Sequence, residues 1–229
     1  MGDGVSDNKV MKGSGLALAS VQFFFTLGWT VYATYLPELL KGAGIALTWL
    51  PWLLMADQLI FATMDIAFGV VADRVADGYR KLAHLLLWLT TVSAGAFLLL
   101  PLLASISSGL LLVVLIIWVV SASVVRAPTM VLLSKRAKAA QQGRLVAGYA
   151  FGMALASALS PFLGLMLKGA DPRLPFAISA LTLLAAVFVL LRFSGSQPAE
   201  TESDAPPPLP FNAYLPLLLV LGLATFAFQ

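Results

Sequence analysis

Long apolar runs alternate with short polar segments along most of the chain. An apolar helix of about 20 residues crosses the ~30 Å hydrocarbon core of a bilayer. The runs are continuous rather than alternating apolar and polar, which excludes a transmembrane β-barrel. A backbone in lipid must satisfy its own hydrogen bonds, so only helices or a closed barrel can span a membrane. With the barrel excluded, the runs are expected to be transmembrane helices. The pattern predicts helices at about 15–40, 46–72, 82–103, 109–133, 143–168 and 174–193.

Two polar segments flank this six-helix region, which we take as residues 15–193. Residues 1–14 are expected to form a cytoplasmic tail. Residues 194–210 are rich in Pro, Ser and acidic side chains, a composition typical of a solvated linker. A further apolar run at 211–229 is expected to be a truncated seventh helix that starts a C-terminal bundle, with the rest of that bundle missing.

The composition agrees with a membrane protein and narrows its chemistry. Of the 229 residues, 60% are hydrophobic and 11% are charged, against about 25% charged in soluble domains. There is no cysteine, and His84 is the single histidine. Disulfides, thiolate catalysis and Cys or His-cluster metal sites are therefore excluded. We expect no cofactor and no metal.

The basic residues indicate an orientation. With the N-terminus in the cytoplasm, ten Lys and Arg residues fall in inside segments and three in outside loops. This asymmetry follows the positive-inside rule. We therefore expect an integral protein of the cytoplasmic (bacterial inner) membrane. Because the basic residues sit in short loops between apolar runs, the net charge of +3 does not indicate nucleic-acid binding.

The segment GVVADRVADGYRK joins the second and third predicted helices. It resembles the loop G-x-x-x-D-[RK]-x-G-[RK]-[RK] of the major facilitator superfamily, although two extra residues precede its second glycine. The resemblance implies an all-α membrane protein with a six-helix bundle of the major facilitator type. It also implies a gating motif in which charge-assisted contacts latch the two halves together; alternatively, the basic residues only enforce topology. The motif positions are Gly69, Asp73, Arg74, Gly78, Arg80 and Lys81.

The fifth predicted helix contains GYAFGMALASALSPFLG. This stretch resembles the glycine-rich fifth helix of antiporters in the superfamily. Small residues let helix backbones approach closely, and a proline can bend a helix. Ordinary small-residue packing explains the stretch equally well. The helix-packing and bending candidates are Gly148, Gly152, Pro161 and Gly164.

Charged residues interrupt two of the apolar runs. Asp57 and Asp65 lie in the second run, and Arg126 lies near the end of the fourth. A charge at the bilayer centre costs at least about 2.5–3.5 kcal/mol, so each one needs an explanation. A carboxylate there can take up a proton or ligate sodium. Arg126 can pair with Asp65 or extend to the cytoplasmic surface. These three residues are our candidates for ion coupling.

Uncharged polar residues follow a helical spacing in the first run. In the superfamily the first helix lines the central cavity, so this stripe is expected to contact a substrate. Hydrogen bonding between helices is the alternative. With one residue of the second run, the substrate-cavity candidates are Gln22, Thr26, Trp29, Thr30 and Gln58.

These features favour a proton-coupled secondary transporter that moves a small solute by alternating access. A cation-coupled sugar symporter resembling the glycoside–pentoside–hexuronide group is a second hypothesis, because Asp65 lies four residues before Gly69. Ile66 and Phe61 depart from that group's pattern. A non-transporting membrane scaffold or assembly factor is a third. An enzyme is not expected, because no Ser–His pair or paired-carboxylate site at water depth is present. The expected partners are a small-molecule substrate, H⁺ or Na⁺, the lipid bilayer and the missing C-terminal half of the same chain.

Overall fold

The computed structural model describes residues 3–74, 79–126, 129 and 139–195. Within these ranges the regular structure is helical and no strand is present. Six helices in the described ranges are long and apolar enough to cross a membrane. The predicted all-α membrane fold is therefore confirmed. The predicted linker and seventh helix, 194–210 and 211–229, lie almost entirely outside the described residues.

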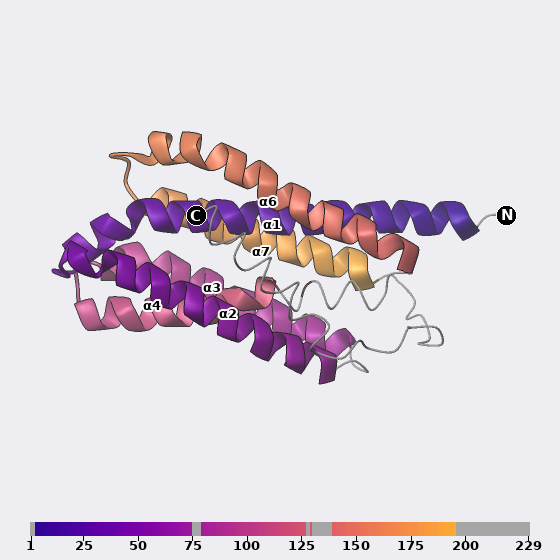
Figure 1. Cartoon of the computed structure of the whole chain (residues 1–229), viewed down its shortest axis with the longest axis horizontal. Helices are drawn as coiled ribbons and strands as arrows, with labels where there is room; N and C mark the ends of the chain where they lie inside the picture. Colours follow the sequence, from indigo (N-terminus) through magenta and orange to yellow (C-terminus); the bar gives the residue numbers. More distant parts are fainter. Residues whose placement is uncertain (1–2, 75–78, 127–128, 130–138, 196–229) are drawn as a thin grey trace, which may run out of the picture. The chain divides into compact units, whose positions relative to one another are not determined.

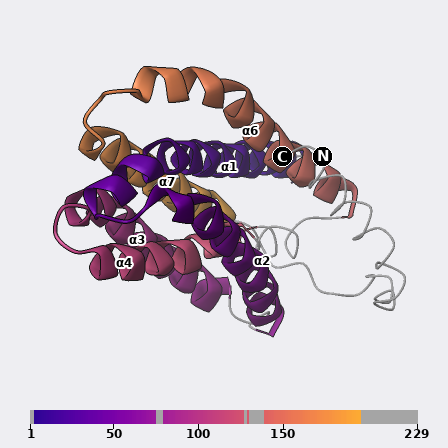
Figure 2. The same cartoon turned by 60° about the vertical axis from the view of Figure 1, so that its left-hand side comes forward.

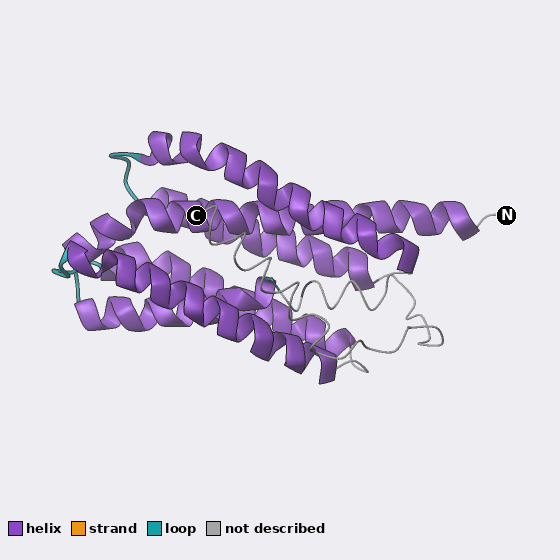
Figure 3. Cartoon of the chain, viewed as in Figure 1, coloured by secondary structure: helices purple, strands orange, loops and turns teal. Residues whose placement is uncertain are grey.

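The predicted helices correspond one to one with observed helices (Figure 1). Two single-turn 3₁₀ helices adjoin them, η1 (Leu47–Trp49) before the second and η2 (Ser123–Val125) after the fourth. The loops that join successive helices at the end opposite the N-terminus all lie at that one end of the bundle (Figure 3). The helices are α1 (Asp3–Gly42), α2 (Leu50–Arg74), α3 (Tyr79–Leu103), α4 (Ser108–Ala122), α6 (Ala139–Leu167) and α7 (Arg173–Gly195).

The first helix is longer than the sequence pattern predicts. It begins at Asp3, whereas the apolar run begins near residue 15. Adding a residue to an existing helix fixes few dihedral angles for each hydrogen bond gained. The only proline inside this helix is Pro37, so none stands in the way of propagation into the polar segment. The expected tail at 1–14 is thus helical from Asp3 onward.

The fourth helix is shorter than predicted. We expected it to continue to residue 133, but α4 ends at Ala122 and is followed by η2 and a turn at Arg126. Pro128 accounts for this correction, because proline has no N–H and its ring clashes with the carbonyl four residues earlier. The residue before a proline also avoids helical dihedrals. The break places Arg126 in a turn rather than on a regular helical face.

The helices form a bundle in which α1 packs mainly against α6 and α7 (Figures 1 and 2). Helix α3 joins α7 to α4, and α2 packs against α4 and η2. Phe97 of α3 and Phe176 of α7 stack in the apolar core with ring centroids 4.4 Å apart. The Tyr35 hydroxyl, buried beside Phe176, donates to the carbonyl oxygen of Leu167 at the end of α6 (2.9 Å). Aromatic packing and this hydrogen bond hold α1, α3, α6 and α7 together.

Glycines bring α1 and α6 into close contact. A β-carbon at Gly148 would lie 2.8 Å from the carbonyl oxygen of Gly15, and one at Gly152 would overlap the carbonyl oxygen of Ala19. Any side chain at Gly152 would therefore force the two backbones apart. Near the other end of α6, a β-carbon at Gly164 would lie 3.7 Å from Oγ1 of Thr34, an ordinary van der Waals distance. Pro161 lies inside α6, which continues to Leu167.

Candidate functional site

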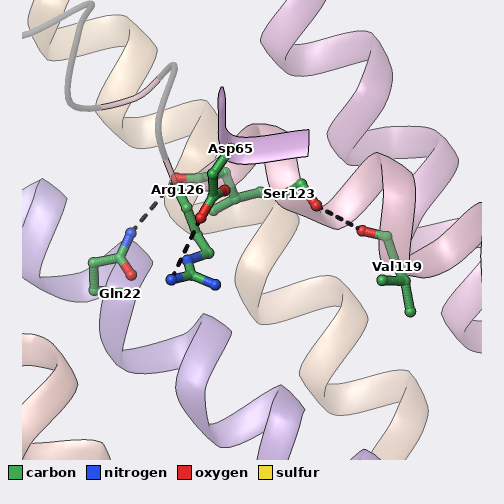
Figure 4. Close-up of polar contacts among 6 residues, drawn as sticks. Gln22, Asp65, Val119, Ser123 and Arg126 are labelled. Atoms are coloured by element: carbon green, nitrogen blue, oxygen red, sulfur yellow. Dashed lines mark hydrogen bonds and ion pairs between the residues drawn. The ribbon is translucent and has the colours of Figure 1, made fainter. Parts of the chain in front are cut away.

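An ion pair joins α2 to the turn after η2. Nη2 of Arg126 lies 3.5 Å from Oδ2 of Asp65 (Figure 4). The Arg126 side chain is 36% exposed and that of Asp65 is 26% exposed. The sequence left Arg126 two alternatives, pairing or extension to the surface, and the structure contains the pair. Asp65 lies near the end of the apolar span Leu47–Phe68, and Arg126 directly follows the span Ser108–Val125, so each charge offsets part of the other's desolvation cost.

The ion pair leaves one oxygen of Asp65 without a partner. Oδ1 is buried and accepts no hydrogen bond from any residue that the structure describes. The Arg126 guanidinium also lies over the Phe61 ring, with Cζ 5.6 Å from the ring centroid. A cation over an aromatic face is attracted by the ring quadrupole. Arg126 therefore has two favourable neighbours, one charged and one aromatic.

Side-chain hydrogen bonds to backbone carbonyls stabilise the turn that carries Arg126. The Gln22 side chain of α1 is buried and its Nε2 donates to the carbonyl oxygen of Val125 at 3.5 Å, a long hydrogen bond (Figure 4). The Ser123 hydroxyl donates to the carbonyl oxygen of Val119 (2.9 Å). These contacts satisfy carbonyl groups at the point where the regular helix stops.

Asp57 has very different surroundings, although it lies on the same helix as Asp65. It is 1% exposed, and the Tyr32 hydroxyl of α1 donates to its Oδ2 at 2.6 Å. Tyr32 in turn packs against the rings of Trp118 and Trp29, at centroid distances of 4.5 and 5.2 Å. Aromatic rings therefore pack against the tyrosine whose hydroxyl binds this carboxylate.

An open groove of about 460 Å³ runs between α1 and α6. Across it, the hydroxyl oxygens of Thr30 and Ser160 lie 2.7 Å apart. Gln22 and Gln58 do not line this groove: Gln22 is buried inside the bundle and Gln58 is exposed on α2. Three of the five residues predicted to contact a substrate are thus brought together here. The lining consists of Thr26, Trp29, Thr30, Ala33, Thr34, Ser157 and Ser160.

Aromatic rings connect this groove to the ion pair. Trp29, which lines the groove, packs edge to face against Phe61 at 5.4 Å. Phe61 carries the Arg126 guanidinium over its ring. A continuous series of contacts therefore runs from Asp65 through Arg126, Phe61 and Trp29 to the groove.

The predicted gating motif falls largely outside the described side chains. Gly69, Asp73 and Arg74 lie in the last turns of α2, and Arg80 lies at the start of α3, but the description does not extend to their side chains. Lys81 is exposed at the start of α3. Gly78 lies outside the described residues. The motif's role as a latch stays a prediction.

Sequence reasoning missed several residues of the site. Tyr32, Phe61, Ser157 and Ser160 were not among the site candidates. An unpaired buried charge is costly, so a carboxylate in an apolar run needs a hydrogen-bond donor nearby. This requirement could have pointed to Tyr32 as the donor for Asp57. Ser160 was visible as a small residue in the fifth helix, but its contact with Thr30 spans 130 residues of sequence. Within the described ranges, no group of three or more potential metal ligands is present.

Comparison with known proteins gives one positive finding. The family model described as Major Facilitator Superfamily matches residues 18–229, which is most of the chain. Neither the search of curated proteins nor the search of solved structures found a match.

Proposed function

Because the chain belongs to the Major Facilitator Superfamily, a family of membrane transporters, we propose that it moves a small solute by alternating access, driven by a proton gradient. The integral membrane character and the transporter class follow from the family and from the six apolar helices. The proton, the access mechanism and the residues that carry them are the proposal. The cytoplasmic membrane and the inward-facing N-terminus belong to the same proposal and rest on the distribution of basic residues.

The observation that carries the proposal is the ion pair between Asp65 and Arg126 at the ends of two apolar spans. When Asp65 is ionised, its attraction to Arg126 joins α2 to the turn after η2. When Asp65 takes up a proton, that attraction is lost, whereas the contact of the guanidinium with Phe61 remains. A proton arriving from one side of the membrane and leaving to the other can therefore switch a contact between two helices.

The series of ring contacts supports a link between this switch and the solute. Displacement of Arg126 changes what lies on the Phe61 face, and Phe61 supports the edge of Trp29 at the groove. Coupling between separated sites requires such an element with two arrangements that both sites bias. We assign this role to the side chains of Phe61 and Trp29.

We assign different roles to the two acids of α2. Asp65 carries the coupling proton, with Arg126 as the competing cation. Asp57 braces α1 against α2 through Tyr32, because its carboxylate is enclosed and already bound by a hydroxyl. Residues 69–81 would supply the latch at the cytoplasmic end, as the family motif implies.

Sodium coupling is a second candidate, in line with the glycoside–pentoside–hexuronide resemblance. Oδ1 of Asp65 and Oγ1 of Thr129 are both buried without a hydrogen-bond partner among the described residues, and sodium is bound by oxygen atoms. Arg126 already supplies a positive charge to Asp65, so a second cation would be repelled. We therefore favour the proton.

Reconstituted vesicles test the proposal. Uptake of a radiolabelled solute panel is measured under an inward pH gradient, with and without an uncoupler, and separately under a sodium gradient. We expect concentrative movement of at least one solute that the uncoupler abolishes. Movement that follows only sodium would overturn proton coupling. Absence of flux for every solute, with correctly inserted protein, would favour the scaffold hypothesis.

A further inference from the structure

Gln22 places an amide in an apolar part of the bundle. Its side chain is 1% exposed. Leu18 and Val21 of the same helix belong to one apolar cluster with Val125. Because burying an amide without a hydrogen-bond partner is costly, the side chain needs a partner here. That partner is the carbonyl oxygen of Val125, to which Nε2 of Gln22 donates.

The carbonyl of Val125 lies where the backbone runs short of donors. Val125 ends η2, a 3₁₀ helix, in which each carbonyl accepts from the N–H three residues later. The residue three positions after Val125 is Pro128, which has no N–H. Gln22 therefore supplies a donor at the point where proline removes one.

The peptide group that precedes Arg126 is held on both sides. Its carbonyl, that of Val125, accepts from Gln22, and its N–H, that of Arg126, donates to the carbonyl oxygen of Ser123 (3.1 Å). Because a peptide group is planar, two hydrogen bonds on opposite sides limit its rotation. Arg126 has φ −86° and ψ −81°, outside regular helical values, so helical geometry does not set the direction of its side chain. The two hydrogen bonds set it instead.

This direction matters because both contacts of the Arg126 guanidinium are near their limits. Nη2 lies 3.5 Å from Oδ2 of Asp65, and an ion pair extends to about 4 Å. Cζ lies 5.6 Å from the centroid of the Phe61 ring, and a cation–π contact extends to about 6 Å. A small rotation of the turn would therefore weaken both contacts.

Gln22 also connects this turn to the helix that lines the groove. Gln22, Thr26 and Thr30 follow one another at four-residue spacing on α1, and the two threonines line the groove. Residues at this spacing lie on one face of a helix. A shift of α1 at the groove would therefore move Gln22 and the turn that it holds. This route to Arg126 does not pass through the aromatic rings of Phe61 and Trp29.

We propose that Gln22 is a positioning residue whose hydrogen bond to the Val125 carbonyl aims Arg126 at Asp65. The sequence pattern of α1 predicts that Gln22 contacts a substrate, but its amide binds the turn and its side chain is not part of the groove lining. The consequence for transport rests on the proposed function. The consequence for the ion pair does not, so the two are tested separately.

A double-mutant cycle tests the positioning role without a transport assay. Gln22→Met removes the amide and keeps the length of the side chain, and Arg126→Ala removes the group that is positioned. Denaturant titration in mixed micelles gives the unfolding midpoint of each variant. We expect Gln22→Met to lower the midpoint more in the parent protein than in Arg126→Ala, because only the parent has an ion pair to weaken. Equal losses in the two backgrounds would overturn the inference.

Thr90→Val is the matched control for this cycle. Thr90 is buried on α3, and its hydroxyl donates to the carbonyl oxygen of Leu86 in the same helix (2.7 Å). The substitution removes a buried polar group, as Gln22→Met does, but at a hydrogen bond within α3. We expect the same loss in the parent and in Arg126→Ala. A difference between backgrounds as large as that of Gln22→Met would overturn the inference.

The number of protons moved per solute tests the consequence for transport. One ordinary hydrogen bond shifts an equilibrium by about two- to tenfold. Gln22→Met should shift the balance between paired and unpaired Arg126 by this factor and lower the proton-to-solute ratio. Counterflow of the same solute, which needs no ion gradient, should keep its KM. An unchanged ratio, with or without a raised KM, would overturn the inference.

Two further arrangements keep the test decisive. If Gln22→Met does not fold, Gln22→Asn takes its place, because an amide one methylene shorter no longer reaches the Val125 carbonyl, which Gln22 meets at 3.5 Å. We expect the same fall in the proton-to-solute ratio. If the parent protein itself moves no protons with solute, the proposed function fails. The double-mutant cycle then decides the role of Gln22 alone.

Discussion

Asp57 and Asp65 lie eight residues apart on α2, yet their surroundings are opposite. Asp57 is 1% exposed and is held by a short hydrogen bond from Tyr32. Asp65 is 26% exposed, faces Arg126 at 3.5 Å and keeps one oxygen without a partner among the described residues. The Asp57 carboxylate is fixed by one hydrogen bond, whereas the Asp65 carboxylate can bind either Arg126 or a proton.

This difference indicates which buried acid can act as a switch. A group contributes to a switch only when two arrangements have similar free energies. Asp57 would lose a buried hydrogen bond and gain nothing on leaving Tyr32. Asp65 can give up Arg126 when protonated, because the guanidinium then still rests on Phe61. Burial alone therefore does not identify the coupling residue. What distinguishes Asp65 is that its partner, Arg126, has a second favourable contact with Phe61.

The largest effect is expected from Asp65→Asn, which removes the titratable group while keeping its size. Concentrative uptake under a pH gradient should fall to equilibrium, while counterflow of the same solute persists. Vesicle uptake measures both. Asp171→Asn is the matched control, because Asp171 is an exposed acid in the loop before α7, where it accepts a hydrogen bond from the Arg173 backbone N–H. Concentrative uptake that survives in Asp65→Asn removes Asp65 from the coupling role.

Arg126→Ala should destabilise the protein as well as uncouple it. Truncation leaves Asp65 without its counter-charge in an apolar setting. Exposed ion pairs contribute up to about 1 kcal/mol and breaking a fully buried pair costs about 3–5 kcal/mol, so for this half-exposed pair we expect about 2–3 kcal/mol. Denaturant titration in mixed micelles measures the loss. Because Asp65→Asn removes the other charge, the double variant should be more stable than Arg126→Ala alone; additive losses would contradict the pairing.

Tyr32→Phe tests the role of Asp57 and leaves the ion pair of Asp65 in place. It removes the hydroxyl that satisfies Asp57 and should lower the free energy of unfolding by about 1–2 kcal/mol, the cost of an unsatisfied buried acceptor. Proton-driven accumulation should remain, because the ion pair at Asp65 is untouched. The same titration and uptake assays apply. A stable Tyr32→Phe protein that no longer accumulates solute would reverse the roles of the two acids.

Phe61→Leu is expected to have the smallest effect. Leucine keeps an apolar side chain but removes the face beneath Arg126 and the edge contact with Trp29. The loss should be about 1 kcal/mol in stability, the sum of a modest cation–π contact and a tolerated core substitution. The informative measurement is the number of protons moved per solute, which should fall. Unchanged stoichiometry would show that the ring does not connect the ion pair to the groove.

The sequence predicted the elements well because membrane helices depend on local composition. The first six apolar runs became helices, while the seventh lies outside the described residues. The two acids of α2 stood out because charges inside apolar runs are costly. Two boundaries were wrong. Helix α1 extends into a polar segment, and α4 stops short of Pro128. Pro128 itself indicates that a helix ends before it, because proline disrupts the preceding helical turn.

The partners of the site residues were harder to predict, because they depend on helix rotation and on distant contacts. Whether Arg126 meets Asp65 depends on the 3₁₀ turn at Ser123–Val125, which displaces it from the helical register. Tyr32 and Ser160 reach the site through contacts between helices separated along the chain. The sequence grouped the polar residues of α1 into one stripe, but only packing could divide it into Gln22 inside the bundle and Thr30 at the groove.

Proton movement in step with solute provides the most direct test of the central claim that Asp65, and not Asp57, carries the coupling proton. A pH-sensitive dye inside the vesicles records proton flux while a solute gradient drives transport. Asp57→Asn keeps an oxygen that accepts from Tyr32, so it serves as the matched comparison for Asp65→Asn. We predict that solute drives proton flux in Asp57→Asn and moves without protons in Asp65→Asn. Proton flux that persists in Asp65→Asn would contradict the account.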